Sequence, residues 1–78
     1  MSDDVLRLYT IYDHPRDYPK WFVLRSFAVL RGNPEPQGES PALLFKEVER
    51  ARAWCEERGL TCIGKEPDDD PCIVETWI

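Results

Sequence analysis

Two stretches of the chain alternate apolar and polar residues with the period of two that is typical of β-strands. The pattern predicts one strand over residues 5–13 and a longer one over residues 21–31. The connection between them contains two prolines and suits an antiparallel hairpin with a long loop. Alternation divides the first strand into one face with Leu6, Leu8, Thr10 and Tyr12 and an opposite face with Arg7, Tyr9, Ile11 and Asp13.

A helix is predicted over residues 46–58, because Val48, Ala51 and Cys55 recur on one helical face and Gly59 is typical of the residue that ends a helix. Residues 42–45 are four apolar residues in a row, which fit either a short edge strand or a first helical turn. We favour the strand because such a run is not amphipathic, although Ser40 before Pro41 is a helix-start signal.

Two further strands are predicted over residues 60–64 and 72–78, and residues 32–41 are predicted to be a loop rich in glycine and proline. None of the seven prolines falls inside a predicted element. The order β-β-(β)-α-β-β predicts an α+β fold in a single domain over residues 1–78. We expect a small two-layer sandwich, with a mainly antiparallel sheet of three to five strands and one helix on one face.

A right-handed crossover through the helix would return the chain parallel to the second strand. The last strand then fits beside the first strand, which becomes the centre of the sheet. We expect the helix to cover the face that carries Leu6, Leu8, Phe22, Leu24, Val74 and Thr76.

The opposite sheet face would be left uncovered, and it would be unusually apolar and aromatic. Its members would be Tyr9, Ile11, Val23, Arg25, Phe27, Val29, Ile73, Glu75 and Trp77. Arg25 would reach over the first strand toward Glu75. An apolar patch of this kind often marks an interface, and the alternative is a sheet surface with scattered apolar residues that need no explanation.

His14 is the one residue whose ordinary pKa lies near neutrality, and it stands beside Asp13. The two side chains fit an acid–base pair or two ligands toward a metal. However, a metal site usually needs three or four ligands, and the sequence has no second histidine. We favour a plain loop start, in which the aspartate accepts backbone hydrogen bonds. The sequence predicts no catalytic residue, no metal ligand and no cofactor.

The net charge is −5, and six of the acidic residues lie in the N-terminal tail and in the run over residues 66–70. Without a basic surface, we expect no binding to nucleic acid. Three cysteines make no even disulfide framework, the acidic N-terminus is unlike a signal peptide, and no apolar run approaches the roughly 20 residues that span a bilayer. These features predict a soluble cytoplasmic protein with reduced thiols and no contact with a membrane.

Three segments carry a resemblance to a known family. They are Tyr9-Thr10-Ile11-Tyr12-Asp13-His14-Pro15, Phe22-Val23-Leu24-Arg25 and Asp69-Asp70-Pro71-Cys72-Ile73-Val74-Glu75-Thr76-Trp77. With these segments the chain resembles a family of small bacterial and phage-associated proteins to which no activity is attached. The resemblance implies a bacterial cytoplasmic setting and no mechanism.

Three functions stay open on this basis. The first is a non-enzymatic module that self-associates or binds a protein partner through the aromatic sheet face. The second is a small enzyme or ligand-binding protein with a site around His14, Asp13, Arg25 and Glu75. The third is a binder of single-stranded nucleic acid that stacks bases on Tyr9, Phe27 and Trp77, which the acidic charge disfavours.

Overall fold

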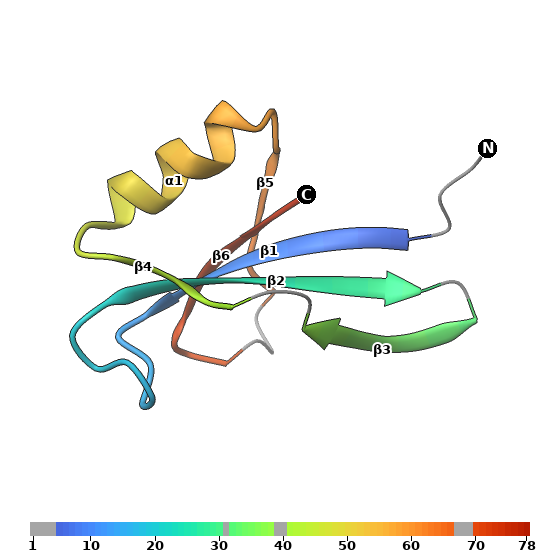
Figure 1. The fold of residues 1–78 in the computed structure, drawn as a ribbon, viewed down its shortest axis with the longest axis horizontal. Coiled ribbons are helices and arrows are strands. Elements are labelled where there is room, and N and C mark those ends of the chain that lie inside the picture. The colour runs from blue at the N-terminus through green and yellow to red at the C-terminus, as the bar shows by residue number, and fades with distance from the viewer. Residues whose placement is uncertain (1–4, 31, 39–40, 67–69) are drawn as a thin grey trace.

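The computed structural model describes residues 5–30, 32–38, 41–66 and 70–78, and within these it contains six strands and one helix (Figure 1). In chain order the elements are β1 (Val5–Asp13), β2 (Phe22–Leu30), β3 (Asn33–Gly38), β4 (Leu43–Phe45), α1 (Val48–Glu57), β5 (Cys62–Gly64) and β6 (Ile73–Trp77). The expected α+β class is confirmed, as are the first strand, the short strand before the helix and the helix itself.

The sheet has the strand order β3-β2-β1-β6-β5, with β4 paired to the part of β2 that β3 leaves free. Every pairing is antiparallel. The expected return of the chain parallel to β2 after the helix is therefore wrong, because β5 pairs with β6 and runs antiparallel to β2. The strand β1 lies between β2 and β6, as the sequence predicted. The two long strands, β1 and β2, lie at the centre of the sheet, and the shorter strands lie on both sides of them.

The strand β3 was not expected, because it lies in the stretch predicted to be a loop and contains Pro34 and Pro36. Proline has no N–H to donate to a ladder, so it is tolerated only on edge strands and at bulges. Both conditions hold here, since β3 is an edge strand and its register with β2 shifts between Ala28 and Leu30. The sheet therefore has six strands, one more than the largest number expected.

The helix α1 presents one apolar side to the sheet and ends at a glycine. Ala51 and Cys55 are fully buried on that side. Gly59 has φ 73°, a left-handed conformation that glycine adopts without steric cost, and its N–H donates to the carbonyl of Glu56 at 3.0 Å. The helix stop at Gly59 thus follows from the residue type.

The register between β1 and β2 decides which residues face the helix. Odd-numbered residues of β1 lie opposite even-numbered residues of β2, and even-numbered residues of β1 lie opposite odd-numbered ones. Ile11 thus lies opposite Leu24, and Thr10 lies opposite Arg25. Residues that lie directly opposite each other share a sheet face. The odd-numbered side chains of β1 therefore join the even-numbered ones of β2.

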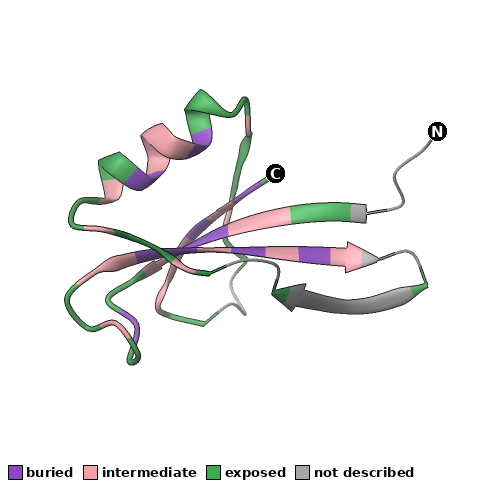
Figure 2. Cartoon of the chain, in the orientation of Figure 1, coloured by how far each residue is buried: buried purple, intermediate pink, exposed green. Residues whose placement is uncertain are grey.

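The predicted assignment of the two faces is wrong for β1 and β6 as a result. The core under α1 contains Ile11, Leu24, Ala51, Cys55 and Trp77, with half-buried Tyr9 and Val74 packed against it (Figure 2). Leu24 and Val74 were expected there, whereas Tyr9, Ile11, Glu75 and Trp77 had been assigned to the uncovered face. Leu6, Leu8 and Thr76, which were expected under the helix, lie on the opposite side.

Candidate functional site

The residues predicted to form one binding surface lie in three separate places. Ile11 and Trp77 are core residues with 0% and 7% exposure. Tyr9 is half-buried, and its ring centroid lies 5.7 Å from that of Trp54 on α1. These three side chains hold the helix to the sheet. Ile11 and Trp77 are therefore not available to a partner in the folded chain.

Glu75 is also on the helix side, where it is held by two donors. Its two carboxylate oxygens accept hydrogen bonds from Nε and an Nη of Arg52, both at 3.1 Å. The indole N–H of Trp77 donates to the same carboxylate at 2.7 Å. The hydrogen bond and the charge of Glu75 raise the pKa of Arg52 above its ordinary value. This network connects α1 to β6. The sequence analysis missed Arg52, because helical spacing carries no information on a partner in the distant strand β6.

Arg25 lies on the other side of the sheet and does not meet Glu75. Its guanidinium forms an ion pair with Asp17 and lies 5.9 Å from the ring centroid of Tyr18, so both partners come from the loop between β1 and β2. The predicted pairing of Arg25 with Glu75 is therefore wrong. The physical reason is the register, which places these two side chains on opposite faces.

Asp13 and His14 form an exposed side-chain pair at the end of β1. The ring of His14 meets the edge of Phe22 with a centroid separation of 4.9 Å, and its backbone has φ 47°. A left-handed backbone is uncommon for residues other than glycine, although histidine adopts it more often than most. Neither Arg25 nor Glu75 bonds to this pair, so the four residues proposed for an enzymatic site do not converge.

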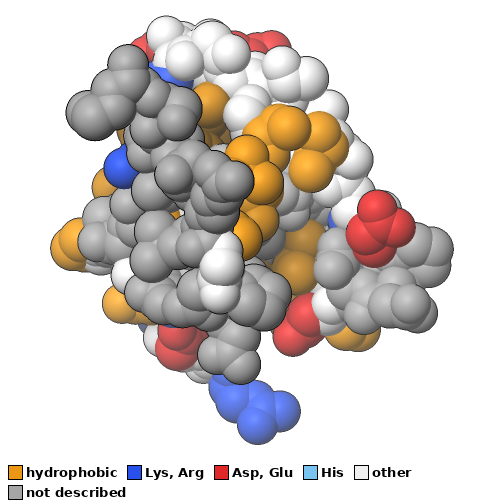
Figure 3. Space-filling view, turned by 90° about the vertical axis from the view of Figure 1, so that its right-hand side faces the viewer, with side chains coloured by type: hydrophobic (Ala, Val, Ile, Leu, Met, Phe, Trp, Pro, Cys, Tyr) orange, Lys and Arg blue, Asp and Glu red, His pale blue; other side chains and the backbone are white. Residues whose placement is uncertain are grey.

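The sheet face without a helix is called here the open sheet face. Its described residues on β1, β2 and β6 are Leu6, Leu8, Thr10, Tyr12, Val23, Arg25, Phe27, Val29, Ile73 and Thr76. Leu6 is 53% exposed, and Leu8, Phe27 and Val29 are half-buried, whereas Val23 and Thr10 are buried at 0% and 6% exposure. The accessible apolar part of the face is therefore its end at Leu6, Leu8, Phe27 and Val29. Hydrophobic side chains reach the surface at the end of the molecule where β1 begins and β2 ends (Figure 3).

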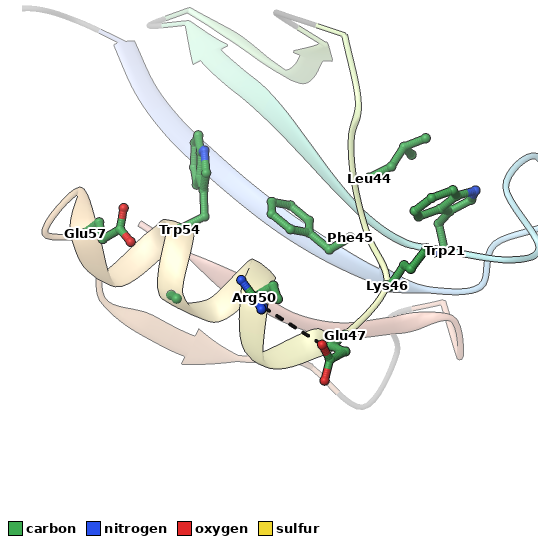
Figure 4. A pocket seen from close by; sticks show the side chains of 9 residues that line it. Trp21, Leu44, Phe45, Lys46, Glu47, Arg50, Trp54 and Glu57 are labelled. Carbon is green, nitrogen blue, oxygen red and sulfur yellow. Dashed lines mark ion pairs between the residues drawn. The ribbon is translucent and has the colours of Figure 1, made fainter.

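A groove of about 550 Å³ lies between the start of α1, β4 and Trp21 (Figure 4). It is lined by Trp21, Leu44, Phe45, Lys46, Glu47, Arg50, Ala53, Trp54 and Glu57. Its charges oppose each other, since Nε of Arg50 lies 3.9 Å from a carboxylate oxygen of Glu47. The ammonium of Lys46 lies 5.8 Å from the ring centroid of Trp21. This groove could not be predicted from the sequence, because its residues come from separate segments.

The three cysteines are free, with Cys55 buried, Cys72 half-buried and Cys62 exposed. Burial raises the pKa of the Cys55 thiol to about 11, and the nearby charge of Glu75 adds to the shift. Within the described residues, no group of three or more His, Cys, Asp or Glu side chains is arranged to hold a metal ion. No helix in the described part of the chain has the length and apolar character needed to cross a membrane.

Comparison with models of known protein families, with curated proteins and with solved structures found no significant match. The resemblance to a family of small bacterial proteins therefore stays a prediction. The geometry of the chain alone carries the functional argument.

Proposed function

We propose that this protein is a non-enzymatic interaction module that self-associates through the open sheet face. One observation carries the proposal. Of the ten described residues that β1, β2 and β6 place on that face, only Arg25 is charged, and its charge is already paired with Asp17 of the same chain. An exposed apolar patch with no unpaired charge among these ten residues is typical of an interface.

The distribution of charge favours a second copy at this face over the helix side. Two copies that each carry a net charge of −5 repel each other in solution. The repulsion is smallest where the approaching surfaces carry few charges, whereas the helix side presents exposed charges of both signs. These are Glu47, Glu49, Glu56 and Glu57 against Lys46, Arg50 and Arg58. A two-fold symmetric contact also needs a surface that matches itself, which an uncharged apolar sheet face provides.

The two other functions that the sequence left open lose their geometric basis. An acid–base or ligand site needs His14, Arg25 and Glu75 together, and these lie on a loop and on two opposite sheet faces. A base-stacking platform needs Tyr9, Phe27 and Trp77 on one face. Phe27 lies on the open face, and the other two lie under the helix.

A reducing cytoplasmic setting is part of the proposal. The three free thiols, of which Cys62 is exposed, support it, since an exposed thiol is easily oxidised outside the cell.

The test is to measure molecular mass by sedimentation over a wide range of concentration, for the parent chain and two matched variants. Leu6→Lys places a charge on the open sheet face. Leu43→Lys places the same charge on the helix side, since Leu43 lies opposite Leu24 and is 37% exposed. We expect Leu6→Lys to weaken self-association about tenfold or more, and Leu43→Lys to leave it unchanged, while neither variant lowers the unfolding midpoint much.

A parent chain that stays monomeric at the highest concentration would contradict the proposal. Equal weakening by the two lysine variants would also contradict it, because the effect would then come from added charge anywhere on the surface.

A further inference from the structure

The helix is too short to cover the sheet face on which it lies. Its ten residues extend for about 15 Å at roughly 1.5 Å each, whereas the nine residues of β1 or β2 extend for about 30 Å at roughly 3.3 Å each. Figure 1 shows β1 and β2 continuing past α1 toward the end where β1 begins. Part of the helix-side face is therefore left without a helix above it.

A pocket of about 310 Å³ lies at this place. It is called here the Tyr9–Trp54 pocket, and its lining is Tyr9, Leu24, Ser26, Pro41, Leu43 and Trp54. The rings of Tyr9 and Trp54 are tilted by 52° with their centroids 5.7 Å apart. Ser26 is only 8% exposed and forms part of the floor of the pocket. Because its side chain is small, it leaves space that a larger residue at this position would fill.

The chemistry of the lining selects the kind of molecule that fits. None of the six lining residues is charged, so a charged group entering the pocket would lose its hydration without gaining a partner. The groove at the start of α1 differs in this respect, because Lys46, Glu47, Arg50 and Glu57 line it. Two aromatic rings in the wall favour an aromatic ligand, which gains tilted or offset ring contacts in addition to apolar burial.

We propose that the Tyr9–Trp54 pocket binds a small uncharged aromatic molecule. The pocket volume lies at the lower end of the range that small-molecule sites occupy, roughly 300–1,000 Å³, which limits the ligand to a few fused or linked rings. The site is independent of self-association, because it lies on the helix side of the sheet and the open sheet face lies on the other.

The test uses two fluorescent probes that differ by one charge. N-phenyl-naphthylamine is uncharged, and anilinonaphthalene sulfonate has the same two aromatic parts with an added sulfonate. Both become bright in an apolar site. We expect the uncharged probe to bind the parent chain with one site per chain, and the sulfonate to bind about tenfold more weakly or worse.

Two neighbouring lysine variants locate the site. Leu43 lines the pocket and is 37% exposed, whereas Leu44, at 39%, lies opposite Val23 and lines the other groove. Leu43→Lys introduces a charge at the pocket and should weaken binding of the uncharged probe about tenfold or more. Leu44→Lys should leave the affinity within about twofold of the parent chain, and the unfolding midpoint of each variant shows that it is folded.

Equal affinity for the two probes, or no binding of the uncharged one, would overturn the proposal. So would loss of binding in Leu44→Lys but not in Leu43→Lys. The variant Leu6→Lys separates this proposal from the proposed function, because it should weaken self-association while the affinity for the uncharged probe stays the same.

Discussion

The two faces of the central sheet do not follow the simple pattern in which the covered face is apolar and the uncovered face is polar. The face under α1 contains a carboxylate, Glu75, which is only 9% exposed. The open sheet face contains aliphatic and aromatic side chains, among them Leu6 at 53% exposure. The polarity of single residues therefore does not show which face the helix covers.

The buried carboxylate is tolerated because its hydrogen-bonding capacity is used. Arg52 donates two hydrogen bonds to it and Trp77 donates one, so little of the cost of leaving water stays uncompensated. On the open sheet face the exposed apolar side chains need no such compensation, and the buried hydroxyl of Thr10 is hydrogen-bonded to that of Thr76 at 3.3 Å. The contrast between the faces can be tested at two pairs of matched residues and at the buried thiol of Cys55.

The largest effect is expected at Trp77. Trp77→Ala removes a side chain that is 7% exposed and leaves a cavity between α1 and β6, so we expect a loss of about 3–5 kcal/mol in the free energy of unfolding. Phe27→Ala is the matched change on the open sheet face and should cost about 1–2 kcal/mol at most, since Phe27 is half-buried. Chemical denaturation followed by circular dichroism measures both. An equal loss for the two variants would show that both faces are buried to the same extent.

A smaller effect is expected at the two arginines that bind carboxylates on opposite faces. Arg52→Ala leaves Glu75 with Trp77 as its remaining donor and should lower the free energy of unfolding by about 1–2 kcal/mol. Arg25→Ala breaks a pair whose Asp17 carboxylate is 56% exposed, so water replaces the lost partner and little change is expected. In Glu75→Gln the loss caused by Arg52→Ala should shrink, because no buried charge is left unpaired. An undiminished loss would contradict the role given to the carboxylate.

The smallest effect at neutral pH is expected at Cys55. Its thiol has a pKa raised to about 11 by burial, against an ordinary value of 9.0 in the unfolded chain. Because the folded pKa is the higher one, the stabilisation is fully present below pH 9 and is lost as the pH rises through about 11. Unfolding midpoints measured across this interval should fall more steeply for the parent chain than for Cys55→Ala.

Thiol labelling with a disulfide reagent provides the control for this prediction. Cys62 is exposed and should react at once, whereas Cys55 should react only when the chain unfolds. Rapid reaction of all three thiols in the folded chain at pH 8 would contradict the burial of Cys55.

Much of the secondary structure could be predicted from local patterns. The alternation over residues 5–13 marked β1 with its correct bounds, and Gly59 marked the end of α1 because few other residues adopt its backbone conformation readily. The strand β3 could not be predicted in this way, because prolines argue against a strand unless the strand is known to lie at an edge.

The candidate sites were less predictable than the elements. Arg25 and Phe27 were correctly expected on the uncovered face, while Tyr9, Ile11, Glu75 and Trp77 were not. The groove and the Tyr9–Trp54 pocket both use Trp54, which is four helical positions from Arg50 and far in sequence from Tyr9. Sequence spacing carries no information on such contacts until the helix has been placed on the sheet.

The sequence by itself determined the α+β class, the order of the strands around β1 and the position of the helix, since each depends on local periodicity, chain order and a few turn residues. The tertiary structure alone decided which face of β1 is buried. Both faces of that strand are apolar, with Leu6 and Leu8 on one and Tyr9 and Ile11 on the other, so alternation does not distinguish them. A shift of one residue in the pairing would have exchanged the two faces. The register with β2 and the packing of Ile11 and Trp77 against α1 made the choice.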